Sequence, residues 1–156
     1  MATAVSATPQ RLALGRAGLA LLALGTQLAL ASCDSGSGAA EPQIPLVAFN
    51  SVINLTNQEY ATLRSDKGAA YVAGGVRGLI VVRQNTSTYS AFERNCPYRA
   101  NDTCARVRID PSRLFLKDAC CNSQFDLQGQ PQSGPATRPL RQYSTSLSGS
   151  ILTITN

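Results

Sequence analysis

The clearest structural signal lies at the end of the chain, which reads Leu140-Arg141-Gln142-Tyr143-Ser144-Thr145-Ser146-Leu147-Ser148-Gly149-Ser150-Ile151-Leu152-Thr153-Ile154-Thr155. Two runs rich in apolar, aromatic and β-branched residues flank the triplet Ser148-Gly149-Ser150, which is typical of a tight turn. This pattern predicts a β-hairpin over residues 140–155, and a hairpin requires further strands to form a stable sheet.

The sequence between residue 44 and this hairpin repeats the same pattern of short apolar runs separated by clusters of Gly, Pro, Asn, Asp and Ser. One helical signal interrupts the strands, because Thr56-Asn57-Gln58-Glu59 matches a capping box and Tyr60 and Leu63 would then face the core. The spacing predicts an all-β domain, a small sandwich or barrel. The expected strands before the hairpin are residues 46–49, 52–55, 71–73, 79–83, 89–92, 107–109, 114–116 and 124–127.

The start of the chain has the three parts of a secretion signal. Arg11 and Arg16 supply a positive region, an apolar run follows, and the segment ends in Leu30-Ala31-Ser32-Cys33. A Leu three residues before a Cys, with small residues between, is the lipobox of bacterial lipoproteins. The apolar run of about 13 residues is shorter than the roughly 20 that a membrane-spanning helix needs. We predict that residues 1–32 are a signal peptide and that Cys33 carries lipid.

A lipidated Cys33 makes membrane lipid the first expected partner and places the protein in the bacterial cell envelope, periplasmic or surface-facing. Residues 33–43 are small and polar, as in a flexible tether, and residues 44–156 form one β-domain. The formal charge of +5 falls to +3 once Arg11 and Arg16 leave with the signal, too mild a charge to indicate nucleic acid. We expect an envelope protein, of unknown identity, as the second partner.

The chain contains no His, so the commonest general base and metal-binding imidazole are missing. No other catalytic arrangement stands out, and we expect no enzymatic activity. Of the five Cys, lipid consumes Cys33, and an even number in an oxidising compartment predicts two disulfides. Adjacent Cys bond only with strained geometry, so two of the three pairings stay open. The residues to be paired are Cys96, Cys104, Cys120 and Cys121.

Residues 74–156 resemble a known family. The stretch Cys120-Cys121-Asn122-Ser123-Gln124-Phe125, followed by Ser133-Gly134-Pro135-Ala136 and then Pro139-Leu140, is similar to the second cluster-binding box of Rieske iron–sulfur proteins and the segment after it. Upstream, Cys96-Pro97-Tyr98 resembles the first box. The resemblance implies that the predicted all-β domain is a small Rieske-like sandwich or barrel.

In that family two thiolates bind one iron and two imidazoles bind the other iron of a two-iron two-sulfur cluster. Carried over by position, the resemblance assigns the four ligand positions to Cys96, Tyr98, Asp118 and Cys121. Because only Cys96 keeps its ligand type, we expect that the cluster is lost and that neither cofactor nor metal is bound. The alternative is a two-iron two-sulfur electron-transfer protein of a respiratory or oxidoreductase complex.

The resemblance also implies a disulfide between the two cluster loops, at Cys104 and Cys120, with residues 101–103 as an insertion. By the same analogy we hypothesise a second disulfide, Cys96–Cys121, in the place of the cluster. Each bridge would add roughly 2–4 kcal/mol. Free or mixed thiols, or four thiolates holding zinc or a cluster, are the alternatives, although the Cys-x-x-Cys spacing usual for a metal site is absent.

Together these features predict an envelope lipoprotein whose Rieske-like domain, without its cluster, serves as a binding or structural module. Five arginines surround the first box and have two interpretations, a surface for an anionic partner or ordinary solvated side chains. They are Arg94, Arg99, Arg106, Arg108 and Arg113.

Overall fold

The computed structural model describes residues 43–156 of the chain. The predicted signal, Cys33 and all but the last residue of the predicted tether lie outside the described residues. Within residues 43–156 the structure is β, apart from one short 3₁₀ helix, so the all-β prediction is confirmed. None of the helical structure in this part is long and apolar enough to cross a membrane.

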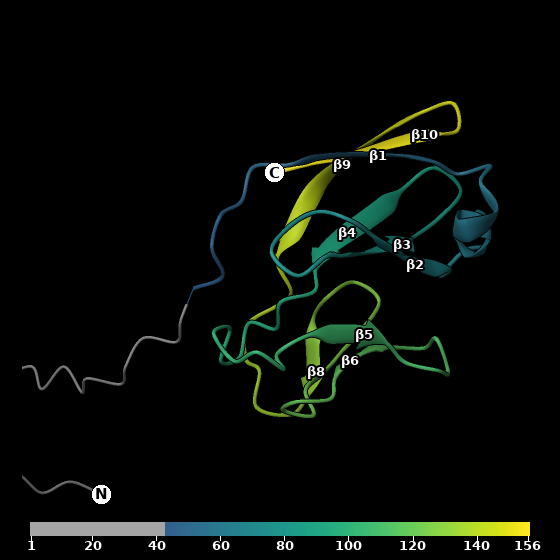
Figure 1. The fold of residues 1–156 in the computed structure, drawn as a ribbon. Coiled ribbons are helices and arrows are strands. Elements are labelled where there is room, and N and C mark those ends of the chain that lie inside the picture. Colours follow the sequence, from purple (N-terminus) through teal and green to yellow (C-terminus); the bar gives the residue numbers. More distant parts are fainter. Residues whose placement is uncertain (1–42) are drawn as a thin grey trace, which may run out of the picture. The chain divides into compact units, whose positions relative to one another are not determined.

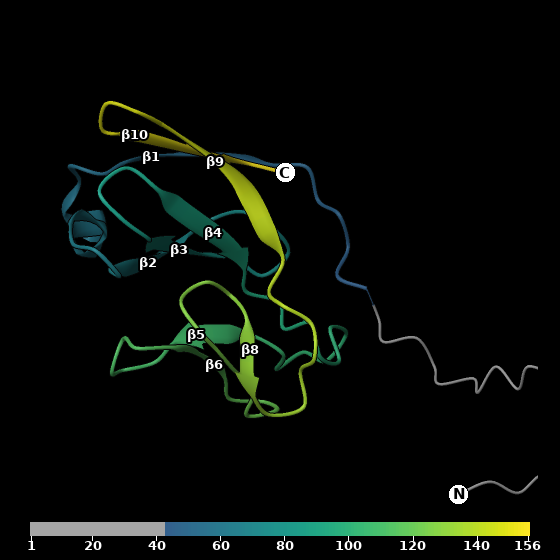
Figure 2. The same ribbon diagram turned by 180° about the vertical axis from the view of Figure 1, so that it is seen from behind.

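The strands form two antiparallel sheets, which Figures 1 and 2 show from opposite sides. The larger has the order β1-β10-β9-β4-β3-β2, and the smaller, drawn below it, has the order β5-β6-β7-β8. The strands of the larger sheet are β1 (Asn50–Asn54), β2 (Ala69–Val72), β3 (Leu79–Arg83), β4 (Tyr89–Glu93), β9 (Gln142–Ser148) and β10 (Ile151–Thr155). The smaller sheet comprises β5 (Val107–Ile109), β6 (Leu116–Asp118), β7 (Gln124–Phe125) and β8 (Pro131–Ser133), and helix η1 (Gln58–Arg64) joins β1 to β2.

The predicted hairpin is formed by β9 and β10. Ser148 pairs with Ile151, which leaves a two-residue turn at Gly149 and Ser150. Gly149 has a φ of 58°, as the first central residue of a type II′ turn requires. Leu152 and Ile154 point from β10 into the core, where both are almost fully buried. Alternation along the strand therefore fixes which face of the hairpin is apolar.

Strand β3 separates two apolar cores. Leu79 and Val81 belong to the core on one face, with Leu63 of η1 and residues of the hairpin. Ile80 and Val82 belong to the core on the other face, which the smaller sheet completes. Burial on both faces explains why β3 is apolar from Leu79 to Val82. The second core also contains Cys96 and is contacted by Tyr98 and Cys121, so the predicted ligand positions lie beside it.

Several sequence predictions differ from the structure. Residues 46–49 form no strand, and the strand expected at 114–116 is β6 instead, two residues later, because Leu114 is 74% exposed while Leu116 is fully buried. Strand β8 was not predicted, since Pro131 and its polar neighbours carry no apolar alternation. Pro131 is compatible with a strand here because β8 is at the edge of its sheet.

The predicted capping box is also wrong. Asn57 is the residue before η1, and its side chain makes no capping hydrogen bond. Instead the Asn54 side chain accepts hydrogen bonds from the backbone N–H and the hydroxyl of Thr56, at 3.0 and 2.9 Å. This local turn competes with a helix start. The predicted inward positions hold, because Leu63 is buried and Tyr60 packs against the same core.

Candidate functional site

Three loops meet at one end of the smaller sheet. The first loop, residues 94–106, connects β4 to β5, the second, residues 119–123, connects β6 to β7, and the third, residues 134–141, connects β8 to β9. A disulfide joins Cys104 of the first loop to Cys120 of the second. This is the pairing that the Rieske resemblance implies. Both of its cysteines are exposed.

The second pair of cysteines joins the same two loops without a bond. Cys96 is fully buried in the first loop, Cys121 is half-buried in the second, and their Sγ atoms are 3.9 Å apart. The hypothesised Cys96–Cys121 disulfide is therefore not formed in this structure, although the two thiols are in contact. Asp118, the last residue of β6, completes a cluster in which one ligand atom from each residue lies within 4.8 Å of the others.

Hydrogen bonds hold the side chains of this cluster in place. Asp118 is fully buried, and its carboxylate accepts from the Cys120 N–H at 2.9 Å and from the Cys121 thiol at 3.3 Å. The Cys121 Sγ is also 3.1 Å from the hydroxyl of Ser123, which accepts the Ala136 N–H at 3.0 Å. Ser123 thus couples the second loop to the third.

A close backbone approach explains the glycine in the third loop. Gly134 has a φ of 87°, and a Cβ placed on it would lie 2.5 Å from the Ser123 Cα. Only glycine combines this conformation with this proximity. The Arg138 guanidinium donates to the Pro97 carbonyl at 2.6 Å and ties the third loop to the first. All three loops are therefore fixed to one another around the thiols.

The environment keeps the Cys96 thiol protonated. Burial raises the pKa of Cys96 far above its ordinary value, and a hydrogen bond to Asp118, together with the negative charges of Asp118 and Cys121, adds to the rise. A thiolate is the reactive form of cysteine. Cys96 in this state is therefore a poor nucleophile at neutral pH.

A cavity of about 250 Å³ opens beside the cluster. Tyr98, the remaining predicted ligand position, lies on its wall, with the Arg99 guanidinium 5.4 Å from the centre of its ring. The structure therefore gathers all four predicted ligand positions into one place. The lining residues are Tyr98, Arg99, Asp102, Asp118, Cys120, Cys121 and Pro135.

The arrangement does not fit a two-iron two-sulfur cluster. By the family's positions, Cys96 would bind one iron and Cys121 the other, so the cluster would separate the two sulfurs. Two metal–thiolate bonds of about 2.3 Å already span about 4.6 Å end to end, before the distance between the irons is added. The observed Sγ–Sγ distance of 3.9 Å is shorter. In addition, no imidazole exists in the chain to bind the second iron.

Two residues outside the predicted set position the first loop. The Glu93 carboxylate, fully buried, accepts from the N–H groups of Val76, Arg77 and Asn95 at 2.7–2.9 Å and from the Tyr143 hydroxyl at 2.9 Å. Burial and the Glu93 carboxylate raise the pKa of Tyr143 to about 12.

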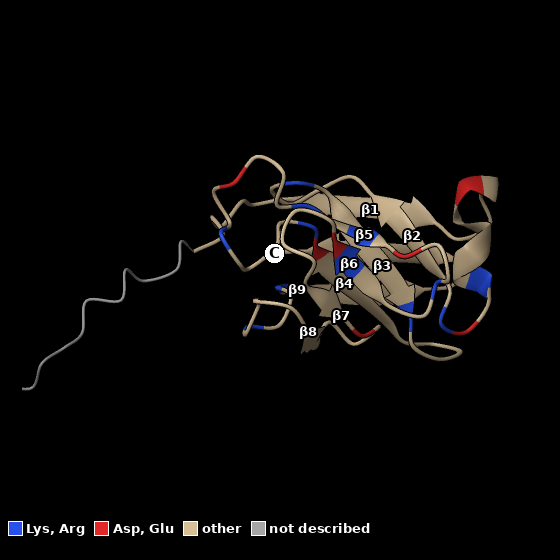
Figure 3. Ribbon diagram, turned by 90° about the horizontal axis from the view of Figure 1, so that it is seen from below, with Lys and Arg blue, Asp and Glu red and all other residues tan. Residues whose placement is uncertain are grey.

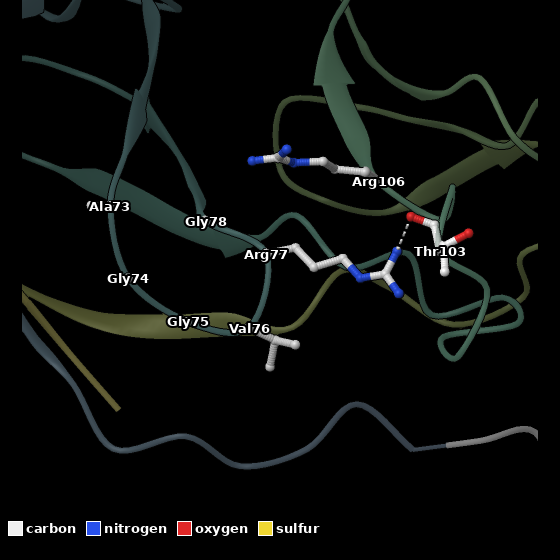
Figure 4. Close-up of a pocket in the computed structure, with 8 residues that line it drawn as sticks. All are labelled: Ala73, Gly74, Gly75, Val76, Arg77, Gly78, Thr103 and Arg106. Carbon is white, nitrogen blue, oxygen red and sulfur yellow. Dashed lines mark hydrogen bonds between the residues drawn. The ribbon is translucent and has the colours of Figure 1, made fainter.

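Arg77 fastens the first loop to residues 74–78 beside it. Its guanidinium donates to the carbonyls of Ala100, Thr103 and Ala105 at 3.0–3.3 Å, and Figure 4 shows the bond to Thr103. An open hollow of about 560 Å³ lies next to this contact, and the Arg106 side chain borders it in the same view. Arg77 is committed to these carbonyls, so its role here is structural.

Of the five arginines around the first box, Arg94 is half-buried and the other four, Arg99, Arg106, Arg108 and Arg113, are exposed. The Arg94 guanidinium lies over the Tyr71 ring at 4.0 Å and donates to the Val107 carbonyl. These contacts give Arg94 a structural role. Burial, together with the neighbouring charges of Arg106 and Arg108, lowers the pKa of Arg94. Figure 3 shows basic and acidic residues interspersed along the ribbon.

The solved structures similar to this chain include two that each match 70% of its length. One is the cyanobacterial plasma membrane Rieske protein PetC3 from Synechocystis PCC 6803, with 23% identity, 98% of that chain covered and a TM-score of 0.49. The other is the ferredoxin of carbazole 1,9a-dioxygenase from Nocardioides aromaticivorans IC177, with 16% identity, 97% of that chain covered and a TM-score of 0.44. No family model and no curated protein matches the chain.

Proposed function

We propose that this chain is a lipid-anchored protein of the bacterial cell envelope, whose Rieske-like domain works without a two-iron two-sulfur cluster as a non-enzymatic binding or structural module. The observation that carries this proposal is the 3.9 Å contact between the Cys96 and Cys121 sulfurs. This contact occupies the space in which the family would hold its two irons. A fold without its site does not carry the family's function.

The three loops that would surround a cluster are held together by other means. A disulfide, the Ser123 bonds and the Arg77 contacts fix their positions. The loops therefore present a defined surface around the cavity, with the exposed Arg99 at its rim. A rigid surface of this kind suits recognition of a protein partner.

An absorption spectrum of the full chain, purified anaerobically from membranes, tests the absence of the cluster. We expect no visible iron–sulfur bands and no stoichiometric iron or acid-labile sulfide. A brown protein with two irons and two sulfides per chain would overturn the proposal and establish the electron-transfer alternative.

Lipid attachment is tested separately by metabolic labelling with a fatty acid. The Cys33→Ser variant should lose the label and leave the detergent-soluble membrane fraction. The matched Ser32→Ala variant should keep both properties, because a small residue remains before the Cys. Retained label in Cys33→Ser would refute the anchoring part of the proposal.

The binding role is tested with a photo-cross-linking amino acid in the native envelope. Placed at Arg99, on the rim of the cavity, it should give a discrete adduct with an envelope protein. Val52 of β1 is 59% exposed and serves as the control position, where we expect no such adduct. Equal labelling at both positions would indicate non-specific contact and contradict a dedicated surface.

A further inference from the structure

The distances within the thiol cluster have the dimensions of a single metal site. For one tetrahedral ion with metal–thiolate bonds of about 2.3 Å, two sulfur ligands lie about 3.8 Å apart. The Cys96 and Cys121 sulfurs are 3.9 Å apart. A carboxylate oxygen bonded at about 2.1 Å would lie about 3.6 Å from each sulfur. The distance from the Asp118 Oδ2 to the Cys121 Sγ is 3.3 Å.

We propose that Cys96, Asp118 and Cys121 bind one zinc-type divalent cation, with a water molecule as its fourth ligand. Two thiolates and a carboxylate form a donor set that zinc accepts readily. All three donors are presented from a fixed framework, the end of β6 and the two loops that the Cys104–Cys120 disulfide joins.

The burial of Asp118 supports the assignment. A fully buried carboxylate is rare unless a cation or a metal compensates its charge. Within residues 43–156, no Lys or Arg forms a salt bridge with the fully buried Asp118. The salt bridge in this part of the chain joins Arg83 to Asp66. Its partners are neutral donors, the Cys120 N–H and the thiols of Cys121 and Cys96. A cation between Asp118 and the two sulfurs would supply the missing charge.

The surroundings also match those of a metal site with an open position. The Cys120 N–H fixes the second oxygen of Asp118, and the Ser123 hydroxyl contacts the Cys121 sulfur, as outer-shell groups that orient ligands do. The 250 Å³ cavity borders Asp118 and Cys121 and has room for a coordinated water. Arg99 on its wall offsets the net negative charge that two thiolates and a carboxylate leave on a divalent ion.

Binding exchanges protons for metal. Each of the two thiols releases one proton to solvent, and no electrons are transferred. The site therefore requires the reduced form of both cysteines, which is the form in this structure. A Cys96–Cys121 disulfide would abolish the metal site, so the chain cannot hold this disulfide and the metal at the same time.

The test uses the full chain, purified anaerobically from membranes in detergent without added reductant. Elemental analysis and native mass spectrometry should find one zinc per chain after equilibration with zinc sulfate. Replacement by Co²⁺ should produce the thiolate-to-metal charge-transfer absorption and the intense visible bands of a tetrahedral site. Thiol counting after acid unfolding should find two free thiols.

Isosteric variants assign the ligands. Asp118→Asn keeps an acceptor for the Cys120 N–H, and Cys121→Ser keeps a small polar group, so both should fold, as circular dichroism can verify. Each should weaken zinc binding by at least about 100-fold, beyond the 10–100-fold loss typical of outer-shell changes. Asp102→Asn, on the same cavity wall, is the control and should bind as the wild type does.

Three results would overturn the metal site alone. They are zinc affinity unchanged in a folded Asp118→Asn protein, no zinc bound to a chain with two free thiols, and a Cys96–Cys121 disulfide in the anaerobically purified chain. These results would leave the cluster-free binding module intact. Two irons with two labile sulfides would overturn the metal site and the proposed function together.

Discussion

Two pairs of cysteines cross the same two loops, and they differ in every property that governs their chemistry. Cys104 and Cys120 are exposed and bonded, whereas Cys96 is buried, Cys121 is half-buried, and the two remain thiols. Cys120 and Cys121 are neighbours in the chain, yet one faces solvent and the other the second apolar core. One pair stabilises the loops by a covalent bond, and the other pair remains as two free thiols.

The difference has a chemical reason. Disulfide formation needs a thiolate that an oxidant or another disulfide can reach. Burial and Asp118 raise the pKa of Cys96, so this sulfur is both protonated and shielded from solvent. The exposed pair has neither protection. The two pairs should therefore contribute differently to the free energy of unfolding.

Removal of the exposed bond should have the largest effect. The Cys104→Ser, Cys120→Ser double variant loses a cross-link between residues 16 apart, and urea denaturation should show a loss of about 3 kcal/mol. The cross-link restricts the unfolded chain, so the denaturant dependence should change as well. A loss below about 1 kcal/mol would mean that the other loop contacts suffice.

A methyl group at Gly134 disturbs the thiol pair without touching the disulfide. Gly134→Ala should cost about 2 kcal/mol, because the Cβ would meet the Ser123 backbone at 2.5 Å and φ is positive. Gly149→Ala is the matched control, since its φ is also positive but no atom lies within 4 Å of the added Cβ. If the two variants lose equal stability, strain in φ alone explains the effect.

At alkaline pH, ionisable groups such as the thiols change the free energy of unfolding, whereas the disulfide does not. The pKa of Tyr143 is raised to about 12 in the folded state, so its contribution to stability is complete below pH 10 and is lost as the pH rises from about 10 to 12. We expect a loss of about 1–2 kcal/mol over this range, and Tyr143→Phe should abolish it. The raised pKa of Cys96 adds a decline that begins near pH 8.5, and the disulfide adds none. Urea denaturation at a series of pH values measures both, and a flat profile from pH 8 to 12 would contradict the assignment.

The smallest effect is expected for the thiol pair itself. In the metal-free protein, Cys121→Ser should change the free energy of unfolding by about 0.5 kcal/mol, because the residue is half-exposed and Ser keeps a polar contact to Asp118. Urea denaturation beside the Cys104→Ser, Cys120→Ser variant gives the direct comparison. A loss as large as that of the double variant would show that both pairs stabilise the loops equally.

Two kinds of strand could be predicted from the sequence: those buried on both faces, and those in which buried and exposed residues alternate. The continuous apolar run at 79–83 and the alternating run at 151–155 are β3 and β10 with the expected bounds. The polar edge strand β8 could not be predicted, because its strand conformation depends on hydrogen bonds to β7 and not on apolar side chains. The predicted bounds of β6 were wrong because the sequence does not distinguish the exposed Leu114 from the buried Leu116.

The site could be located from the sequence only through its resemblance to the Rieske family, because composition does not indicate which residues lie together. The ligand positions of a distant family placed Cys96, Asp118 and Cys121 together, and the structure brings their ligand atoms within 4.8 Å. The roles of Glu93 and Arg77 could not be predicted from the sequence because most of their partners are backbone groups 16–28 residues away, which leave no side-chain pattern. Gly75 gives a hint, since a Cβ there would lie 2.2 Å from the Glu93 carboxylate.

The exposed disulfide has a consequence for the pair behind it. Because Cys104 and Cys120 are bonded, the first and second loops cannot drift apart, and Cys96 meets Cys121 as an intramolecular neighbour at a high effective concentration. The entropy of bringing the two loops together is already lost in the folded chain, so whatever the thiols bind is held without that cost. Release of such a ligand would leave the loops in place and the site ready for the next one.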